Sequence, residues 1–354
     1  MRRMDVIAGL LDDALAAGLG SAAAVSVGDG GVEVFRHAAG TVRRLPDRGP
    51  AIDAHTAFDL ASLTKPIATV ALAMVLAGEG RLELAAPIRR WLPDAASAGT
   101  VRDLLGHSAG CAAHVEIFRH LRAARPADPY GELIARAARE PCDPPGATAV
   151  YSDLGFIQLG AIVERAAGEA LPEAFARRIA GPLGLRARYA PEPVAGAVAT
   201  ELDERGLVCG LVHDENAYYG GRACGHAGLF GSIGDVARFA AAIVAAANGV
   251  PGALPPGVVA RFLADAPIAG ASWRLGWDTP SPIPGVSQAG DRWPRAHAVG
   301  HTGFTGTSLW LDLPRRRWVA LLANRVHPTR HAGTADAIKV LRRAVNDAAL
   351  AALQ

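Results

Sequence analysis

The chain has 354 residues, which is enough for two domains with a large buried core, and half of its residues are hydrophobic. Its formal net charge is only +2, so neither nucleic acid nor an anionic membrane is expected as a partner. The cysteines, at positions 111, 142, 209 and 224, are too sparse for a disulfide framework, which favours a reduced environment.

The first segment, residues 1–13, has basic residues followed by apolar ones, as a signal peptide does. Asp5, Asp12 and Asp13 interrupt the apolar part, so the segment is better interpreted as an amphipathic helix. No uninterrupted run of about 18 apolar residues occurs in the chain, and a membrane span is therefore not expected. These features together predict a cytoplasmic protein.

The next segments predict a strand hairpin followed by a buried helix. Residues 22–27 and 32–35 flank the sequence Gly-Asp-Gly-Gly, which is typical of two strands joined by a tight turn. Residues 67–76 are apolar nearly all round, which predicts a fully buried helix. Because Pro66 lacks an N–H and is tolerated only in a first helical turn, this helix should begin near Ser62.

Ser62 and Lys65 lie three residues apart, so on a helix they share a face and the amine reaches the hydroxyl. Only Lys65 and Lys339 are lysines among 36 basic residues, and arginine cannot release its proton whereas a desolvated lysine can. The helix N-terminus favours an alkoxide and helps to keep Lys65 neutral. The pair predicts a serine nucleophile with a lysine base, although a surface lysine beside a helix-capping serine remains an alternative for this motif alone.

Beyond residue 80 the pattern becomes helical with proline-rich connections, and residues 86–232 are interpreted as a mainly helical insertion. After a helix at 233–247, two apolar runs at 307–313 and 318–324 predict a second strand hairpin. A closing helix is expected from Thr334 onward.

This order of elements predicts an α+β fold, an α/β sandwich in which an antiparallel sheet is covered by helices on both faces. Residues 1–85 and 233–354 form the sheet domain, and residues 86–232 form the helical domain inserted into it. We expect the active site in the cleft between the two domains.

Two further segments carry chemical groups. Tyr151 follows a proline turn and precedes a helix, and a phenol beside a lysine ammonium can relay protons to a leaving group. Residues 300–306 are glycine-rich and precede a predicted strand, where backbone N–H groups can meet a substrate and its developing oxyanion. Each alone is equally compatible with a structural tyrosine and a plain turn.

In combination, Ser62-Leu-Thr-Lys, Tyr151-Ser-Asp and His301-Thr-Gly resemble the three ordered motifs of the serine β-lactamase and penicillin-binding protein superfamily. The likeness is greatest to the class C β-lactamase-like serine hydrolases, including esterases, D-amino-acid peptidases and enzymes acting on cell-wall peptides. It covers nearly the whole chain, with further landmarks at residues 101–110, 144–146 and 181–185.

The resemblance implies a β-lactamase/transpeptidase-like fold in which Ser62 is acylated, with Lys65 as its base and Tyr151 as the partner acid and base. It also implies that the backbone amides of Ser62 and Phe304 form the oxyanion hole. His301, Thr302 and Gly303 would line the substrate pocket. No metal or other cofactor is implied.

Two residues depart from the family pattern. Asp153 stands where the second motif usually has asparagine, which places a carboxyl group beside Lys65. His301 stands where β-lactamases usually have lysine, so the charge that meets a lactam carboxylate is missing or depends on pH. Both departures disfavour efficient β-lactam hydrolysis.

Residues 211–230 are unusually polar for a segment that precedes a helix, and they resemble a loop that faces the active site in one branch of the superfamily. We hypothesise that His213, Asp214 and Glu215 select the substrate, through a free amino group for example; a loop bonded only to itself is the alternative. Asn324 and Arg325, after the last predicted strand, are candidates for binding a substrate carboxylate.

Two other patterns were weighed and set aside. Residues 106–110 match the Gly-x-Ser-x-Gly nucleophile elbow around Ser108, but the charged segment before it predicts a helix where the elbow needs a buried strand. Cys209, His213, Cys224 and His226 lack the spacing of a structural zinc site.

The sequence therefore predicts a serine hydrolase that forms an acyl-enzyme with a small ester, a peptide or a muropeptide-type amide. The alternatives are a β-lactamase or D,D-carboxypeptidase, and a non-hydrolytic peptide or lactam sensor of the same fold. A small molecule is the expected partner, and the oligomeric state is left open.

Overall fold

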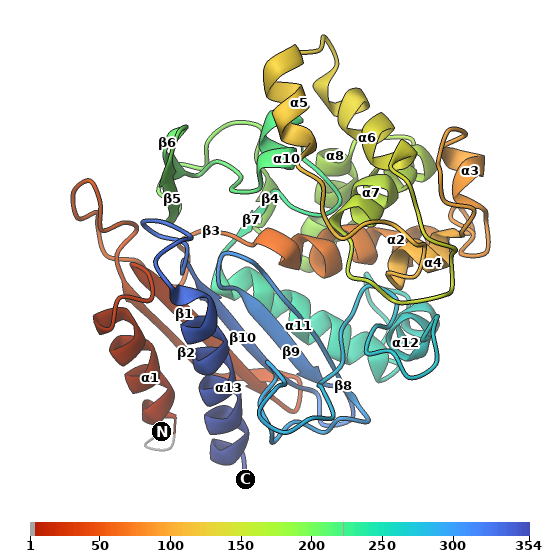
Figure 1. Cartoon of the computed structure of the whole chain (residues 1–354). Helices are drawn as coiled ribbons and strands as arrows, with labels where there is room; N and C mark the ends of the chain where they lie inside the picture. The colour runs from red at the N-terminus through yellow and green to blue at the C-terminus, as the bar shows by residue number, and fades with distance from the viewer. Residues whose placement is uncertain (1–3, 222) are drawn as a thin grey trace.

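The centre of the molecule is a five-stranded antiparallel sheet with the strand order β2-β1-β10-β9-β8 (Figure 1). The computed structural model describes residues 4–221 and 223–354. The strands are β1 (Ala22–Asp29), β2 (Val32–Gly40), β8 (Ala298–Thr302), β9 (Ser308–Asp312) and β10 (Arg317–Ala323). The pairing of Ala23 with Ala323 joins the first hairpin to the last strands, so the two ends of the chain build one sheet.

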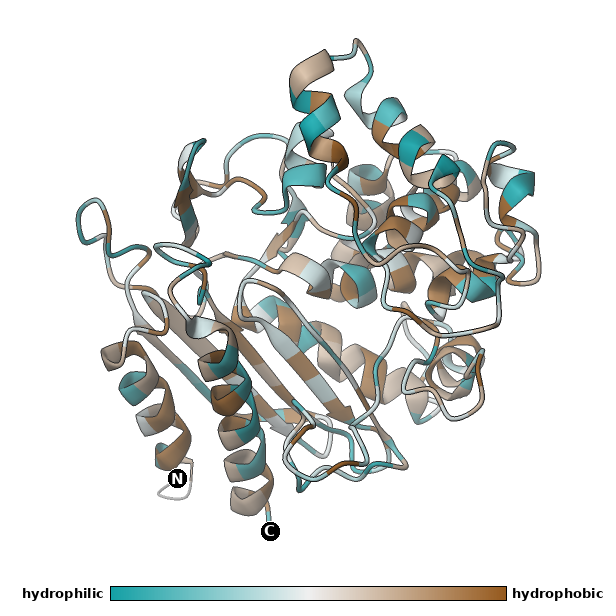
Figure 2. Ribbon diagram, in the orientation of Figure 1, coloured by the Kyte–Doolittle hydropathy of each residue, from teal (hydrophilic) through white to brown (hydrophobic). Residues whose placement is uncertain are grey.

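Helices cover both faces of this sheet, as expected. Helices α1 (Asp5–Ala16) and α13 (Thr334–Ala352) lie side by side on one face, and α11 (Ile233–Ala247) covers the other (Figure 1). Side chains of alternate residues of β10 point to opposite faces of the sheet. Val319 and Leu321 pack toward α1 and α13, while Ala320 and Leu322 belong to the larger core on the other face. Figure 2 shows α13 alternating between hydrophobic and hydrophilic turns, which fits its packing on one side only.

The helix that carries Ser62 is a core element. It begins as a 3₁₀ turn (Ala61–Leu63), continues as a π-helix (Lys65–Val70) and ends as α2 (Ala71–Gly78), so its predicted start near Ser62 is confirmed. Pro66 lies in the first turn of the π-helix, where its missing N–H leaves no helical hydrogen bond unmade, so it is compatible with the wider π-helical turn. The run Ala61–Gly78 is long and apolar enough to cross a membrane, but 78% of it is buried inside the protein, so core packing accounts for its composition.

The segment after α2, residues 86–232, is mainly helical. Its helices are α3 (Ile88–Trp91), α4 (Val101–Leu105), α5 (Ile117–Ala124), α6 (Pro129–Arg139), α7 (Asp153–Ala167), α8 (Leu171–Phe175), a π-helix (Ala176–Ala180), α9 (Gly181–Leu183) and α10 (Glu215–Tyr219). Helix α7 packs against α2, and α12 (Pro256–Ala264) packs on α2 and α11. The α+β fold expected from the sequence is therefore confirmed.

Several strands escaped prediction. Short strands β4 (Arg188–Tyr189), β7 (Leu229–Gly231) and β3 (Phe58–Asp59) form a small sheet that ties the segment before Ser62 to the end of the insertion, and β5 (Ala199–Asp203) pairs with β6 (Gly206–Cys209). Strand β8 forms at the edge of the sheet, where the sequence allowed either an edge strand or a glycine-rich turn, because Gly300, His301 and Thr302 have little β-propensity of their own. Its pairing with β9 supplies what the local sequence lacks.

Asn324, expected to contact substrate, has a structural role instead. Its side chain is only 1% exposed, and its Oδ1 accepts hydrogen bonds from the backbone N–H groups of Ser21 and Ala22, each at 2.9 Å. Its Nδ2 donates to Ser21 Oγ and to the Ala199 carbonyl, each at 2.8 Å. All four bonding positions of the amide are thus used to join β1, β5 and the end of β10.

Replacing Asn324 by alanine should lower the free energy of unfolding by about 2–4 kcal/mol, because buried donors and acceptors lose their partners. Urea denaturation would measure the change. The matched control is Asn248→Ala, which removes an exposed amide bonded to two carbonyl oxygens and should cost less than about 1 kcal/mol. An equal loss in both variants would contradict the structural role assigned to Asn324.

Candidate active site

The Lys65 ammonium group is completely buried at the base of the site. Its Nζ donates to Ser62 Oγ at 3.2 Å, to Asp153 Oδ1 at 2.7 Å and to the His226 carbonyl oxygen at 3.1 Å. Because an ammonium group has three N–H donors, these three acceptors satisfy it fully. The predicted contact between Ser62 and Lys65 is therefore present, and it is part of a larger network.

The protonation state of Lys65 differs from the expectation. Burial lowers its pKa, but the nearby Asp153 carboxylate and Tyr151 raise it more, so the net shift is upward. Burial alone would raise the pKa of Asp153, yet the Lys65 ammonium and the hydrogen bond from His114 hold it far below its usual range. The expected neutral lysine is thus wrong for the resting site, which contains an ion pair.

Tyr151 is the second group in contact with the nucleophile. Its hydroxyl donates to Ser62 Oγ at 2.9 Å, and its ring packs against His107, Trp273 and His301 with centroid distances of 4.8, 5.4 and 5.9 Å. Burial raises the pKa of Tyr151 to about 12, although Lys65 opposes this shift. Tyr151 is therefore a neutral phenol at rest, placed to pass protons to and from Ser62.

Asp153 is the first residue of α7, whose N-cap is Ser152. Its Oδ2 lies 3.5 Å from Nδ1 of His114, and this contact raises the pKa of His114. The carboxylate is thus held between a buried cation and a partly exposed histidine. The carboxyl group that the sequence placed beside Lys65 is bonded to it, and Asp153 also lines both cavities at Ser62.

The loop between β8 and β9 packs tightly against the start of the nucleophile helix. A Cβ on Gly303 would lie 2.0 Å from Thr307 Oγ1 and 2.9 Å from the Leu60 carbonyl oxygen, so only glycine fits. The hydroxyls of Thr305 and Thr307 donate to the carbonyls of Asp59 and Leu60, each at 3.0 Å. These bonds fix Phe304, between Gly303 and Thr305, beside Ser62.

Ala61, directly before the nucleophile, has a φ of +48°, an uncommon conformation for alanine. Asp59 stabilises it, because Oδ1 accepts from the Ala61 N–H at 2.8 Å while Oδ2 accepts from the His213 N–H at 2.7 Å. Backbone strain next to a nucleophile is typical of active sites.

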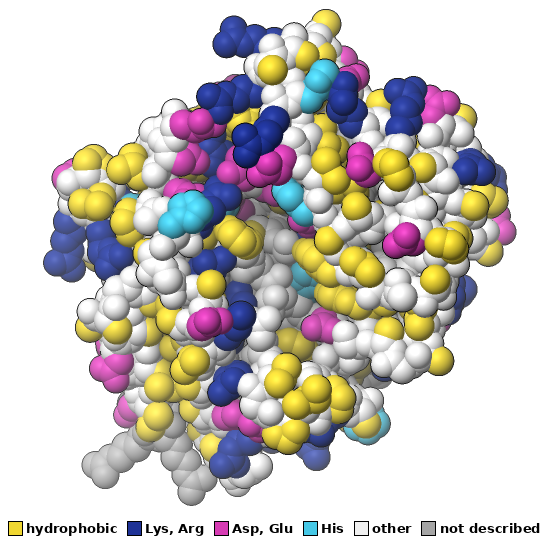
Figure 3. All heavy atoms as spheres, viewed as in Figure 1, with side chains coloured by type: hydrophobic (Ala, Val, Ile, Leu, Met, Phe, Trp, Pro, Cys, Tyr) yellow, Lys and Arg dark blue, Asp and Glu magenta, His cyan; other side chains and the backbone are white. Residues whose placement is uncertain are grey.

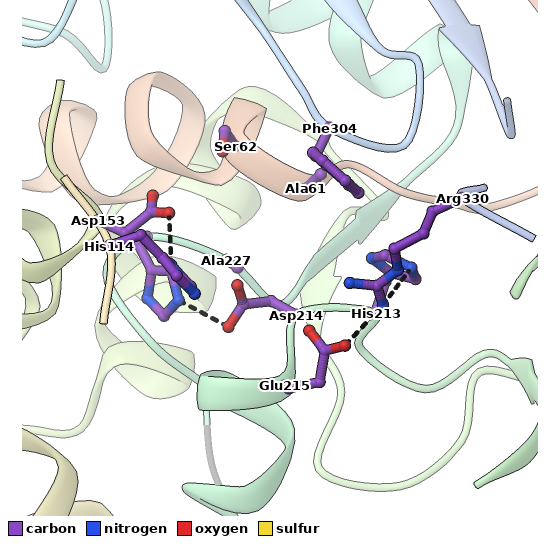
Figure 4. Close-up of a pocket in the computed structure, with 11 residues that line it drawn as sticks. Ala61, Ser62, His114, Asp153, His213, Asp214, Glu215, Ala227, Phe304 and Arg330 are labelled. Carbon is purple, nitrogen blue, oxygen red and sulfur yellow. Dashed lines mark hydrogen bonds and ion pairs between the residues drawn. The ribbon is translucent and has the colours of Figure 1, made fainter. Parts of the chain in front are cut away.

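Two cavities adjoin Ser62, and they differ in charge. The first, of about 250 Å³, is lined by the carboxylates of Asp153, Asp214 and Glu215 (Figure 4). The second, of about 410 Å³, is lined by Tyr151, Trp273, His301, Thr302 and Gly303, by the carboxyl groups of Asp153 and Asp278, and by the cations of Arg325, Lys339 and Arg342. Both touch Phe304, whose ring is half exposed. Figure 3 shows the corresponding hollow, with acidic side chains above it and basic side chains along its left side.

The polar loop before α10 reaches the first cavity, as hypothesised. Asp214 Oδ1 bonds to His226 Nε2 at 2.8 Å, and Glu215 Oε1 accepts from Arg330 at 2.6 Å. His213 also lines this cavity, where it bonds to Glu201 at 2.8 Å and stacks on the Phe304 ring. The loop is therefore bonded partly to itself while it still presents carboxylates to the cavity.

His301 presents no positive charge to the second cavity. Burial, assisted by Lys65, lowers its pKa to about 3, so the ring is neutral. Its Nδ1 lies 2.9 Å from the Thr302 carbonyl oxygen, which can only accept, so Nδ1 carries the proton and Nε2 is an acceptor. The lysine-like cation of the related motif is absent from this position.

Arg325 lies beside the same cavity and is only 7% exposed. Its guanidinium group stacks 4.5 Å from the centroid of Phe304, but within residues 4–221 and 223–354 it makes no side-chain hydrogen bond or ion pair. By contrast, the buried Arg178 is paired with Glu79 and Glu169. Because an unpaired buried cation is costly, this arrangement calls for an explanation.

The patterns set aside in the sequence do not form sites. Ser108 is fully buried with its hydroxyl on Asp103, and the segment before it is helix α4, as predicted. Within the described part of the chain no three His, Cys, Asp or Glu side chains are arranged to hold a metal. His213 and His226 are engaged by carboxylates, and the Cys209 thiol donates to the Ala197 carbonyl.

Sequence reasoning missed several residues of the site. His114, Trp273 and Arg330 belong to no motif and come from loops, so no local signal marked them. Arg342 did carry a signal: it lies four residues after Ile338 and three before Val345, on the buried face of α13. A charge on an apolar helix face indicates a specific partner.

Known proteins share this architecture. The family model described as Beta-lactamase matches residues 8–343. A putative D-alanyl-D-alanine carboxypeptidase of Escherichia coli (strain K12) is 28% identical over 311 residues, covering 77% of this chain and 70% of that protein. The resemblance seen in the three motifs is thereby confirmed.

Solved structures show the same fold. EstCE1, described as a hydrolase with promiscuous acyltransferase activity, matches with a TM-score of 0.71 at 22% identity and covers 98% of both chains. The octameric penicillin-binding protein homologue from Pyrococcus abyssi matches with a TM-score of 0.71 at 19% identity, covering 90% of this chain and 73% of that one.

Replacing Asp153 by asparagine should move the acidic limb of the kcat/KM profile to lower pH by about one unit or more. The carboxylate raises the pKa of Lys65, so its removal lets burial lower that pKa and frees the amine at lower pH. Hydrolysis of an activated ester between pH 5 and 10 would measure the shift.

The matched control is Asp336→Asn, which breaks the exposed pair with the other lysine, Lys339, and should leave the profile unchanged. If the acidic limb of the kcat/KM profile of Asp153→Asn stays in place or moves to higher pH, Asp153 does not set the protonation of Lys65.

Proposed function

The chain belongs to the Beta-lactamase family of serine hydrolases, and we propose that Ser62 is its nucleophile in an acyl-enzyme mechanism of the class C-like type. The observation that carries the proposal is the convergence on Ser62 Oγ of the Lys65 amine, at 3.2 Å, and the Tyr151 hydroxyl, at 2.9 Å. Few arrangements other than nucleophile activation require a buried lysine, a tyrosine and a serine at one cavity mouth.

Acylation requires the resting network to give up one proton, because Lys65 is an ammonium and Tyr151 a phenol at rest. In the form with one proton fewer, the Lys65 and Tyr151 pair accepts the Ser62 proton as Oγ attacks the acyl carbon. The backbone N–H groups of Ser62 and Phe304 stabilise the oxyanion. Tyr151 then protonates the leaving atom, and water releases the acyl group by the reverse sequence.

The position of Tyr151 supports a proposal for which part of the substrate each cavity binds. As donor to the leaving atom, Tyr151 must lie on the leaving-group side, and it lines the second cavity. The acyl group then occupies the first cavity, where Asp214 and Glu215 suit an amino group. Arg325 in the second cavity suits a carboxylate on the leaving group. We therefore propose small esters and peptide or muropeptide-type amides as substrates, in a cytoplasmic enzyme that works without a cofactor.

A D,D-carboxypeptidase-like reaction is the second candidate. The unpaired Arg325 favours it, because a carboxypeptidase releases a leaving group that bears a carboxylate, and the E. coli relative is named as such a putative enzyme. Efficient β-lactam hydrolysis is disfavoured by the neutral His301. A sensor of the same fold would acylate at Ser62 without turnover.

Purified protein should hydrolyse p-nitrophenyl esters in a steady state, and a fluorophosphonate should label Ser62, since this oxygen is the activated one. Peptide mapping by mass spectrometry identifies the adduct, and Ser62→Ala is the blank. An adduct on Ser108 would overturn the assignment. A burst without a steady state would support the sensor instead.

Asp214→Asn and Glu215→Gln should each lower kcat/KM for aminoacyl esters about 10- to 100-fold, because a charge-assisted hydrogen bond to the amine is lost. Matched esters without the amine should be unaffected, and Glu204→Gln, at an exposed ion pair outside the cavity, is the control. Equal effects on both ester series would refute amine selection.

A further inference from the structure

Arg342 connects the last helix to the loop that carries Phe304. It lies in α13, it is only 5% exposed, and its Nη2 donates to the carbonyl oxygens of Gly303 and Thr307, each at 2.7 Å. Its Nη1 donates to Gln288 Oε1. No sequence motif includes this residue, and it takes no part in the proton transfers at Ser62.

The bond to Gly303 bears directly on the oxyanion hole. The Gly303 carbonyl and the Phe304 N–H are the two ends of one peptide unit, so they share a delocalised electron system. A cation on the oxygen end draws electron density from the nitrogen end and makes its N–H a stronger donor. The Phe304 N–H is the group proposed to stabilise the oxyanion.

The charge of Arg342 is not offset by a partner. Within residues 4–221 and 223–354, all its acceptors are neutral oxygens, whereas the buried Arg178 is paired with two glutamates. Burial lowers the pKa of Arg342 to about 9, with a smaller contribution from Arg325, so the guanidinium is still charged at neutral pH. Its field therefore acts on the amides that it contacts.

Holding the Phe304 loop in place does not by itself explain why a buried arginine occupies position 342. The same loop is already held from the opposite side by the hydroxyls of Thr305 and Thr307, which donate to the backbone carbonyls before Ser62. A buried cation without a carboxylate is also an expensive way to fix a loop.

We propose that Arg342 is a positioning residue that strengthens the oxyanion hole, by polarising the Gly303–Phe304 amide and fixing its orientation. The inference rests on the proposed acyl-enzyme function, and it adds a residue 280 positions away from the nucleophile. Its effect should appear where negative charge develops and not where the substrate first binds.

The test compares Arg342→Met, which keeps bulk without charge, with Arg342→Lys, which keeps the charge. We expect Arg342→Met to lower kcat about 10- to 100-fold with KM nearly unchanged, which is less than the loss of a whole oxyanion donor. Its affinity for a phenylboronic acid, which forms a tetrahedral adduct on serine, should fall by a similar factor. Arg342→Lys should recover part of both losses.

Rates are divided by the amount of enzyme that a fluorophosphonate titrates, so that unfolded protein is not counted. The control is Arg343→Gln, which removes the neighbouring guanidinium that bonds to the Gly285 carbonyl away from the site, and it should leave kcat unchanged. An unchanged kcat in Arg342→Met, or an Arg342→Lys enzyme as slow as Arg342→Met, overturns the inference. Wild-type enzyme without a Ser62 adduct refutes the proposed function itself.

Discussion

A buried lysine cation beside the nucleophile is the constraint on which this site depends. The Lys65 ammonium is removed from water completely, and it needs acceptors from the protein for all its donors. They come from three segments: the nucleophile helix through Ser62, the start of α7 through Asp153, and the backbone at His226 before β7. Satisfying one charge thus fixes the helix of Ser62 relative to two segments of the insertion, the start of α7 and the backbone before β7.

The same ion pair explains why an aspartate occupies a position where the family usually has asparagine. A neutral amide would leave the buried ammonium without a counter-charge, and burial would then favour the free amine. With Asp153 the resting state is the ion pair, and the catalytic form is reached by losing a proton. His114, half exposed on the far oxygen of Asp153, is the titratable neighbour nearest to solvent.

Sequence spacing predicted the features that lie within a single helix or strand, whereas features that depend on contacts between distant segments could not be predicted in this way. The pairing of Ser62 with Lys65 and the helix behind them follow from a three-residue spacing and an apolar run, so the sequence sufficed. The family motif placed Asp153 beside Lys65, but the charge on Lys65 was still predicted wrongly. It depends on the 2.7 Å distance between the two groups and on how deeply both are buried, which are properties of the tertiary fold. Strand β8 likewise depends on its pairing with β9, so the local sequence left a turn as an alternative to the edge strand that forms there.

The neutral His301 is best understood from the charges around it. Lys65, Arg325, Lys339 and Arg342 already place four cations near this part of the site, and the pKa of His301 is lowered mainly by burial and partly by Lys65. A lysine on β8 would add a further cation in the same region, at a high electrostatic cost. Arg325, two residues after β10, also lines this cavity, with its guanidinium group 4.5 Å from the centroid of the Phe304 ring. In the proposed function, the positive charge that binds a substrate carboxylate therefore lies after β10 and not on β8.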